Sequence, residues 1–211
     1  MLYILGVQTP SQLLFLPGAS GQRQFWHPVS GLLAHPASRV HVTWPGFDGV
    51  PRDPAIRGMD DLVSMVVDRI DRPSALVAQS MGGVVALRAA LRKPELVTHL
   101  VLCVTSGGID LSAFDAQDWR PAMRAAQPNL PDWFISYRED LAPRLPGLDI
   151  PALLLWGDAD PISPVQVGRR LASLLPRAAL HVFPGADHSL GCTLAARVAP
   201  LIDRHLMSGQ A

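Results

Sequence analysis

Three polar residues with complementary chemistry each follow an apolar run of the chain. They are Ser80 after residues 75–78, Asp160 after 152–156, and His188 after 179–183. A serine hydroxyl is a weak nucleophile at neutral pH unless an imidazole takes its proton. A carboxylate on the other imidazole nitrogen fixes the tautomer and stabilises the cation. The order nucleophile, acid, histidine therefore predicts acyl transfer through a serine.

The sequence around Ser80 fits a sharp turn from a strand into a helix. The apolar run 75–78 is typical of a buried strand, and residues 84–92 are typical of a helix that Pro94 ends. Ala78 and Gly82 stand two positions either side of the serine, where strand and helix pass too closely for large side chains. Such a turn holds the hydroxyl above the helix N-terminus. The pattern small-x-Ser-x-Gly is common by chance, so the flanking elements carry this prediction.

Acyl transfer also requires donors for the oxyanion of the tetrahedral intermediate. The backbone N–H of Met81 can supply one, at the start of the predicted helix. The loop after residues 13–16 can supply the second, from Ala19 following Gly18. Losing one such donor costs about 3–4 kcal/mol of transition-state stabilisation, so this loop matters as much as the acid.

Strands and helices alternate along most of the chain. We expect strands at 1–7, 13–16, 40–44, 75–78, 100–104, 152–156 and 179–183, and helices at 22–35, 60–70, 84–92, 164–175 and 194–206. This alternation predicts an α/β fold with a mostly parallel central sheet and helices on both faces. The ends of parallel strands collect on one edge, which brings Ser80, Asp160 and His188 together.

Residues 106–149 interrupt this alternation with aromatic and charged residues, prolines and no strand pattern. We interpret them as a short helical lid within a single domain, 1–211, and expect them to govern substrate choice. Ile109 and Trp133 are candidate substrate contacts, together with Phe25 and Trp26 after the oxyanion loop. The alternative is that these aromatic residues only pack the segment onto the rest of the domain, which would give the same sequence pattern. The many charges argue against a lipase-like apolar lid, and a small or medium acyl substrate is expected.

Composition excludes several other classes of protein. The 211 residues include 18 basic and 18 acidic side chains, with no basic cluster to suggest nucleic-acid binding. No signal segment and no run near the ~20 apolar residues of a membrane span appear, so we expect a cytoplasmic protein without membrane contact. Neither a metal-binding nor a nucleotide-binding motif is present, so no cofactor or metal is expected. The sequence does not decide the oligomeric state.

At this point the chain resembles the alpha/beta-hydrolase family over nearly its whole length. The matching motifs are Leu16-Pro17-Gly18-Ala19, Trp44-Pro45-Gly46, Gln79-Ser80-Met81-Gly82-Gly83, Trp156-Gly157-Asp158-Ala159-Asp160-Pro161 and Gly185-Ala186-Asp187-His188. The resemblance implies an eight-stranded, mostly parallel sheet and a serine hydrolase with a Ser80, Asp160 and His188 triad. Ala78 and Pro17 depart from the family's usual glycine and histidine. Little chain precedes the oxyanion strand, so we expect the family's first antiparallel strands to be reduced to one.

Some alternatives remain open at this stage. Asp110 follows the strand at 100–104, from which some family members draw the triad acid. A lyase or C–C bond enzyme can use the same residues as acid and base without acylation. A non-catalytic binding protein that retains a degenerate active site is a further alternative, although such proteins usually lose one of the three catalytic residues.

Overall fold

The computed structural model describes residues 8–207, and its strands form one parallel sheet in the order β2-β1-β3-β4-β5-β6. The strands are β1 (Gln12–Leu16), β2 (Ser38–His41), β3 (Ser74–Gln79), β4 (Val97–Cys103), β5 (Ala152–Gly157) and β6 (Ala178–Phe183). The described part thus holds six strands, where the family resemblance implied eight. The strand predicted at residues 1–7 lies outside the described residues.

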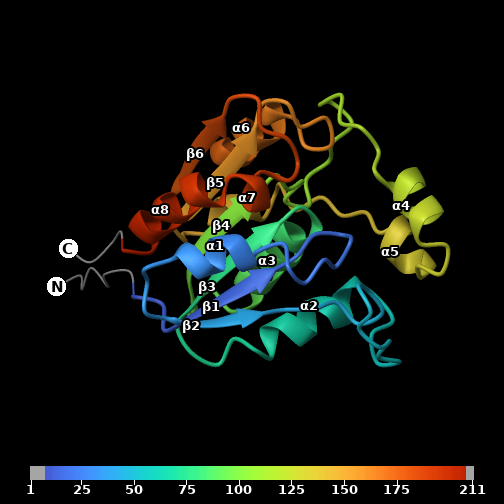
Figure 1. Ribbon diagram of the computed structural model, residues 1–211, viewed down its shortest axis with the longest axis horizontal. Helices are drawn as coiled ribbons and strands as arrows, with labels where there is room; N and C mark the ends of the chain where they lie inside the picture. The colour runs from blue at the N-terminus through green and yellow to red at the C-terminus, as the bar shows by residue number, and fades with distance from the viewer. Residues whose placement is uncertain (1–7, 208–211) are drawn as a thin grey trace.

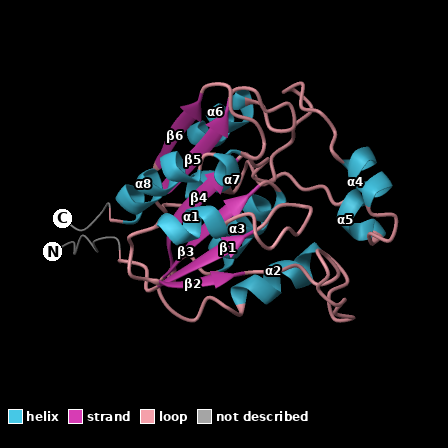
Figure 2. Ribbon diagram, viewed as in Figure 1, coloured by secondary structure: helices cyan, strands magenta, loops and turns pink. Residues whose placement is uncertain are grey.

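Helices cover both faces of the sheet, as the alternating pattern predicted (Figure 1). They are α1 (His27–Leu32), α2 (Met59–Val67), α3 (Met81–Arg92), α4 (Arg120–Ala126), α5 (Asp132–Ser136), α6 (Val165–Leu174), α7 (Leu190–Thr193) and α8 (Ala195–Leu206). One core packs α2, α3 and α6 against the sheet. A second core lies under α1, α7 and α8, which Figure 2 shows together on the near face. Because both faces are covered, β1, β3, β4 and β5 are buried along their whole length.

The register of the strands aligns their carboxyl ends. Leu16 of β1 pairs with Ala78 of β3, which sets the loop after β1 beside Ser80. Gly157 of β5 pairs with Phe183 of β6, so the loops that follow these two strands also emerge side by side. The sheet therefore brings the predicted nucleophile, acid and histidine to one edge.

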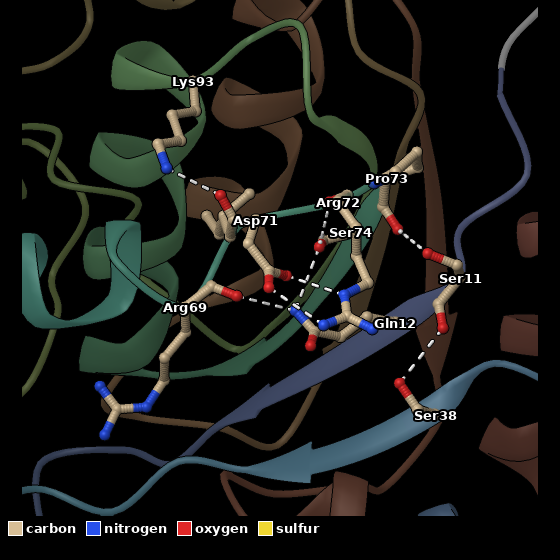
Figure 3. A network of polar contacts seen from close by, with 10 residues as sticks. Ser11, Gln12, Ser38, Arg69, Asp71, Arg72, Pro73, Ser74 and Lys93 are labelled. Atoms are coloured by element: carbon tan, nitrogen blue, oxygen red, sulfur yellow. Dashed lines mark hydrogen bonds and ion pairs between the residues drawn. The ribbon is translucent and has the colours of Figure 1, made fainter.

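The opposite edge is held by polar contacts around the buried side chain of Gln12 (Figure 3). Its Nε2 donates to the carbonyl oxygen of Arg69 at 2.9 Å and to Oγ of Ser74 at 3.2 Å. Oγ of Ser74 in turn donates to the carbonyl oxygen of Arg72 at 2.7 Å. These contacts tie the starts of β1 and β3 to the chain after α2, and so help to fix the register.

The helix predicted at residues 22–35 is shorter in the structure and spans only His27–Leu32. Gly21 has a φ of +68°, and the chain after it runs through turns before α1 begins. At the other end Leu33 is extended, with ψ of 135°. Pro36 disfavours a helical conformation at His35, so the helix could not have continued far.

Between β4 and β5 the chain forms α4, α5 and a 3-10 helix at Leu145–Gly147, with no strand in this described stretch. Figure 1 shows α4 and α5 apart from the layers around the sheet. Two backbone bonds hold the segment: Leu141 N donates to the carbonyl oxygen of Gly108 within it, and Gln117 N donates to that of Pro161 beyond β5, both at 2.8 Å. The second bond joins this segment to the loop that carries Asp160.

Candidate active site

Ser80 occupies the turn between β3 and α3 in an unusual backbone conformation, with φ of 53° and ψ of −123°. Residues other than glycine rarely have positive φ, so the surroundings must hold this turn in place. Ser80 N donates to the carbonyl oxygen of Cys103 at 2.9 Å, and the carbonyl oxygen of Ser80 accepts from Gly83 N at 2.9 Å. The turn thereby fixes the hydroxyl at the N-terminal end of α3.

Glycines allow neighbouring segments to approach this turn. A methyl group on Gly82 would lie 2.5 Å from the carbonyl oxygen of Pro17, and one on Gly83 would lie 2.4 Å from Oγ1 of Thr105. A methyl group on Gly18 would lie 3.2 Å from Cβ of Ser80. The loop after β1 therefore packs directly against the serine, which explains the small residues of both motifs.

His188 joins the serine to a buried carboxylate. Its Nε2 lies 3.0 Å from Oγ of Ser80, and its Nδ1 lies 2.7 Å from Oδ2 of Asp160. The Asp160 side chain is fully buried, whereas that of His188 is 21% exposed. An ionised carboxylate only accepts hydrogen bonds, so Nδ1 of His188 carries the proton and Nε2 is free to accept one from the serine hydroxyl.

Backbone donors hold Asp160 in this position. Its Oδ1 accepts from Ile162 N at 2.8 Å and from Ser163 N at 3.2 Å, which leaves Oδ2 directed at His188. The alternative acid Asp110 is exposed, and its two oxygens accept from N and Oγ of Ser112 at 3.0 and 2.8 Å. These bonds lower the pKa of Asp110. The structure thus pairs His188 with Asp160.

Two backbone donors near Ser80 have no acceptor within residues 8–207. They are the N–H groups of Ala19, in the loop after β1, and of Met81, the first residue of α3. Both residues are more than nine-tenths buried. Because buried N–H groups are normally paired, two free donors flanking one hydroxyl form a site suited to a negatively charged oxygen.

A cavity of about 730 Å³ opens beside this arrangement and is lined in part by Ser80, Met81 and His188. Most of its remaining wall comes from residues 104–140. The wall mixes apolar with charged side chains, among them Ile109, Leu111, Phe134, Asp118, Arg120 and Arg138. Ile109, a predicted substrate contact, lies in the wall of this cavity.

Phe25, Trp26 and Trp133 do not line this cavity, which corrects their prediction as its walls. Trp26 is 1% exposed, and its Nε1 donates to the carbonyl oxygen of Leu16 at 3.0 Å. Phe25 packs edge-on against Trp26 in the core beneath α7. Trp133 packs edge-on against Phe134, with 5.6 Å between ring centroids. Phe25 and Trp26 thus pack in the core, and Trp133 packs within the segment between β4 and β5. The sequence could not distinguish packing from cavity lining, because aromatic residues serve equally well in both roles.

The sequence did not single out several residues that line the cavity. Met59 comes from α2, and the charged side chains of Asp118, Arg120 and Arg138 come from the segment between β4 and β5. The many charges in this segment were visible in the sequence. Which of them face Ser80 depends on how α4 and α5 pack, and no local pattern encodes this.

Residues 8–207 contain no cluster of three or more His, Cys, Asp or Glu side chains suited to a metal ion. Within the same range, no helix is long and apolar enough to cross a membrane.

Comparison with known proteins places the chain in a family. A profile described as the alpha/beta hydrolase family matches residues 13–147, and one described as the alpha/beta hydrolase fold matches residues 136–193. The chain belongs to the alpha/beta hydrolase family. The first match contains Ser80 and the loop of Ala19, and the second contains Asp160 and His188.

Several relatives of this alpha/beta hydrolase are named as hydrolases or esterases. The "Uncharacterized hydrolase YugF" of Bacillus subtilis is 29% identical over 161 residues, which cover 56% of this chain and 59% of that protein. A pimeloyl-(acyl-carrier protein) methyl ester esterase of Nitrosomonas europaea is 26% identical over 223 residues, 84% of this chain and 88% of the relative. This chain thus spans about three fifths of the first relative and most of the second.

The solved structures share the fold of this alpha/beta hydrolase at low sequence identity. A lipase-esterase related protein from Clostridium acetobutylicum has a TM-score of 0.76 and is 18% identical to this chain. The likeness covers 95% of this chain and 96% of that structure. At this identity the comparison establishes the architecture alone.

Proposed function

We propose that this protein is a serine hydrolase that cleaves a small or medium acyl ester or thioester through an acyl-Ser80 intermediate. One observation carries the proposal: Ser80 Oγ, His188 and Asp160 form a continuous hydrogen-bonded chain. Three side chains remote in sequence have no packing reason to meet in this way beside a cavity. Their order and roles are those of a nucleophile, a general base and an orienting acid.

The reaction proceeds in two halves. Nε2 of His188 takes the hydroxyl proton while Oγ of Ser80 attacks the substrate carbonyl carbon. The N–H groups of Met81 and Ala19 stabilise the oxyanion, and Asp160 stabilises the imidazolium. Collapse of the tetrahedral intermediate breaks the ester or thioester bond, and His188 gives its proton to the departing alkoxide or thiolate. The products of this half are an alcohol or thiol and acyl-Ser80.

Water then completes the cycle. Nε2 of His188 takes a proton from a water molecule whose oxygen attacks the acyl-Ser80 carbonyl. When the second tetrahedral intermediate collapses, the acid product leaves and the proton returns to Oγ of Ser80. The name of the Nitrosomonas europaea relative, a methyl ester esterase, supports ester cleavage as the chemistry.

The test is hydrolysis of p-nitrophenyl esters and matched thioesters, with intact-protein mass spectrometry after rapid acid quenching. We expect turnover and a quenched species heavier by one acyl group. Ser80→Ala should lower kcat by at least about a thousandfold and abolish the adduct. Ser112→Ala is the control, because it removes a different hydroxyl from the same cavity. Ester turnover that persists in Ser80→Ala would overturn the proposal.

A further inference from the structure

The cavity beside Ser80 has a wall with two arginine side chains that the proposed acylation chemistry does not use. Arg120 is the first residue of α4, and Arg138 follows α5 by two positions. Both line the same cavity as Ser80 and His188. A ligand that fills the cavity therefore extends from the serine toward two guanidinium groups.

Arg120 is held in place and incompletely paired. Its Nη1 donates to Oδ1 of Asp118 at 2.9 Å, and its guanidinium carbon lies 5.3 Å from the Trp119 ring centroid. Its Nε is buried and has no hydrogen-bond partner, the one side-chain atom of this kind in the described part of the chain. A buried charged donor without an acceptor is costly and rare in native proteins, so this one requires an explanation.

Arg138 forms no salt bridge at contact distance within residues 8–207. Its Nη1 donates to the carbonyl oxygens of Ile135 and Tyr137 at 3.0 and 2.8 Å, and its Nε and Nη2 donate to no acceptor in the described part. Burial opposes the ionisation of Asp118, but hydrogen bonds from Arg120 and the charges of Arg120 and Arg138 outweigh it and lower the pKa of that carboxyl. Two cations thus act on one carboxylate.

The other acidic groups of the cavity restrict the charge that this wall can attract. Glu139 pairs with Arg88 at 3.4 Å, and Asp110 and Asp140 accept hydrogen bonds from nearby residues of their own loops. Because these carboxylates also line the cavity, a doubly charged phosphate would be repelled more strongly than a singly charged carboxylate. A planar carboxylate also suits the fork of donors on a guanidinium group.

We propose that Arg120 and Arg138 bind a carboxylate on the substrate, remote from the scissile bond, so that the preferred substrates are half-esters of dicarboxylic acids. The ester part of this statement rests on the proposed function, whereas the carboxylate site stands on the arginine wall alone. A bound carboxylate would pair with Nε and Nη2 of Arg138, which donate to no acceptor in the described part of the chain. Arg120 and Arg138 are then specificity-determining residues.

The kinetic test compares two esters of equal chain length, mono-p-nitrophenyl glutarate and p-nitrophenyl valerate, with succinate and adipate half-esters as length variants. We expect the wild-type protein to have a higher kcat/KM for the best half-ester than for the matched neutral ester. Arg120→Gln and Arg138→Gln should each lower this ratio by about tenfold or more, since each removes a charged hydrogen-bond donor to the substrate carboxylate. In the same variants, the rate of hydrolysis of the neutral ester shows whether folding and catalysis are intact.

Arg124→Gln is the matched control, because Arg124 lies on the same helix, pairs with Asp132 and does not line the cavity. It should leave the ratio at the wild-type value. A wild-type ratio near one that neither Arg120→Gln nor Arg138→Gln changes would overturn the carboxylate site and leave the proposed hydrolase intact.

A binding measurement separates the two proposals. Calorimetric titration of Ser80→Ala with the monomethyl esters of the same diacids requires no turnover. We expect binding that weakens by about tenfold or more when Arg120→Gln is added and that weakens with added salt. If no ester is cleaved but this binding is seen, the proposed function fails and the carboxylate site stands. If none of the half-esters binds, the carboxylate site is overturned whatever the hydrolysis results.

Discussion

Gly82 lies directly against Pro17, because a methyl group on Gly82 would come within 2.5 Å of the Pro17 carbonyl oxygen. This contact joins the first turn of α3 to the loop after β1. The two free N–H groups, those of Met81 and Ala19, belong to these same two segments. A methyl group at position 82 would force these two segments apart, so Gly82 sets the spacing of the proposed oxyanion donors.

Gly82→Ala should consequently impair both stability and turnover. The added methyl group meets backbone atoms, so the loop must shift, and we expect a loss of about 1–3 kcal/mol in the free energy of unfolding. Urea denaturation and ester hydrolysis measure the two effects. Gly31→Ala is the control, since nothing lies within 4 Å of its new methyl group. An unaltered kcat in Gly82→Ala would contradict the proposed role of this contact.

The identity of the acid can be tested by two asparagine substitutions. Asp160→Asn keeps the size of the side chain but removes the charge that holds the Nδ1 proton of His188, so kcat should fall by about 10⁴-fold. Asp110→Asn should retain most of the rate, because Asp110 bonds to Ser112. Steady-state kinetics on one ester decides between them. A larger loss of kcat in Asp110→Asn than in Asp160→Asn would identify Asp110 as the triad acid.

His205 makes the fold sensitive to acid. Burial, followed by the charge of the neighbouring His99, lowers the pKa of His205 to about 4, from an ordinary value of 6.5. The native state thus favours the neutral ring, and the contribution of His205 to the stability of the folded protein is complete above about pH 6.5. The contribution is lost as the pH falls from there toward 4, and amounts to about 3 kcal/mol.

His205→Gln should therefore flatten the dependence of stability on pH, because the glutamine amide can still donate to the Leu100 carbonyl oxygen but does not titrate. Tm is measured for both proteins between about pH 7 and about pH 4.5. We expect a smaller fall in Tm for the variant. Equal falls in the two proteins would show that His205 does not control the acid response.

The two cysteines should differ in reactivity. Cys103 is fully buried, and burial together with the charge of Asp160 raises the pKa of its thiol well above the ordinary range. Cys192 is partly exposed. Iodoacetamide at about pH 8 should therefore modify Cys192 and spare Cys103 in the folded protein. Peptide mass mapping reads out both sites, and rapid modification of Cys103 would contradict this description of its environment.

The sequence predicted the fold and the residues at the strand ends because strong local patterns encode both. Apolar runs at residues 13–16, 75–78 and 152–156 are strands in the structure, since strands buried on both faces are continuously apolar. Parallel register then brings Ser80 and His188 to one edge, although 108 positions separate them. No side-chain detail was needed for that inference.

The residues that the sequence misplaced depend on tertiary packing. Phe25 and Trp26 follow a turn at Gly21 that directs them into the core beneath α7, and the predicted helix ignored that turn. Arg120 and Arg138 face the cavity because of how α4 and α5 pack. A pattern of residue types cannot distinguish a solvent-exposed arginine from one that faces a cavity.

The central claim is that His188 activates the hydroxyl of Ser80, and covalent labelling tests it most directly. A fluorophosphonate probe reacts with a serine whose hydroxyl is activated in this way, and peptide mass mapping identifies the modified residue. We predict modification of Ser80 in the wild-type protein, much slower modification in His188→Gln and none at this position in Ser80→Ala. A folded wild-type protein that the probe leaves unmodified, or modifies only at another residue, would contradict the account.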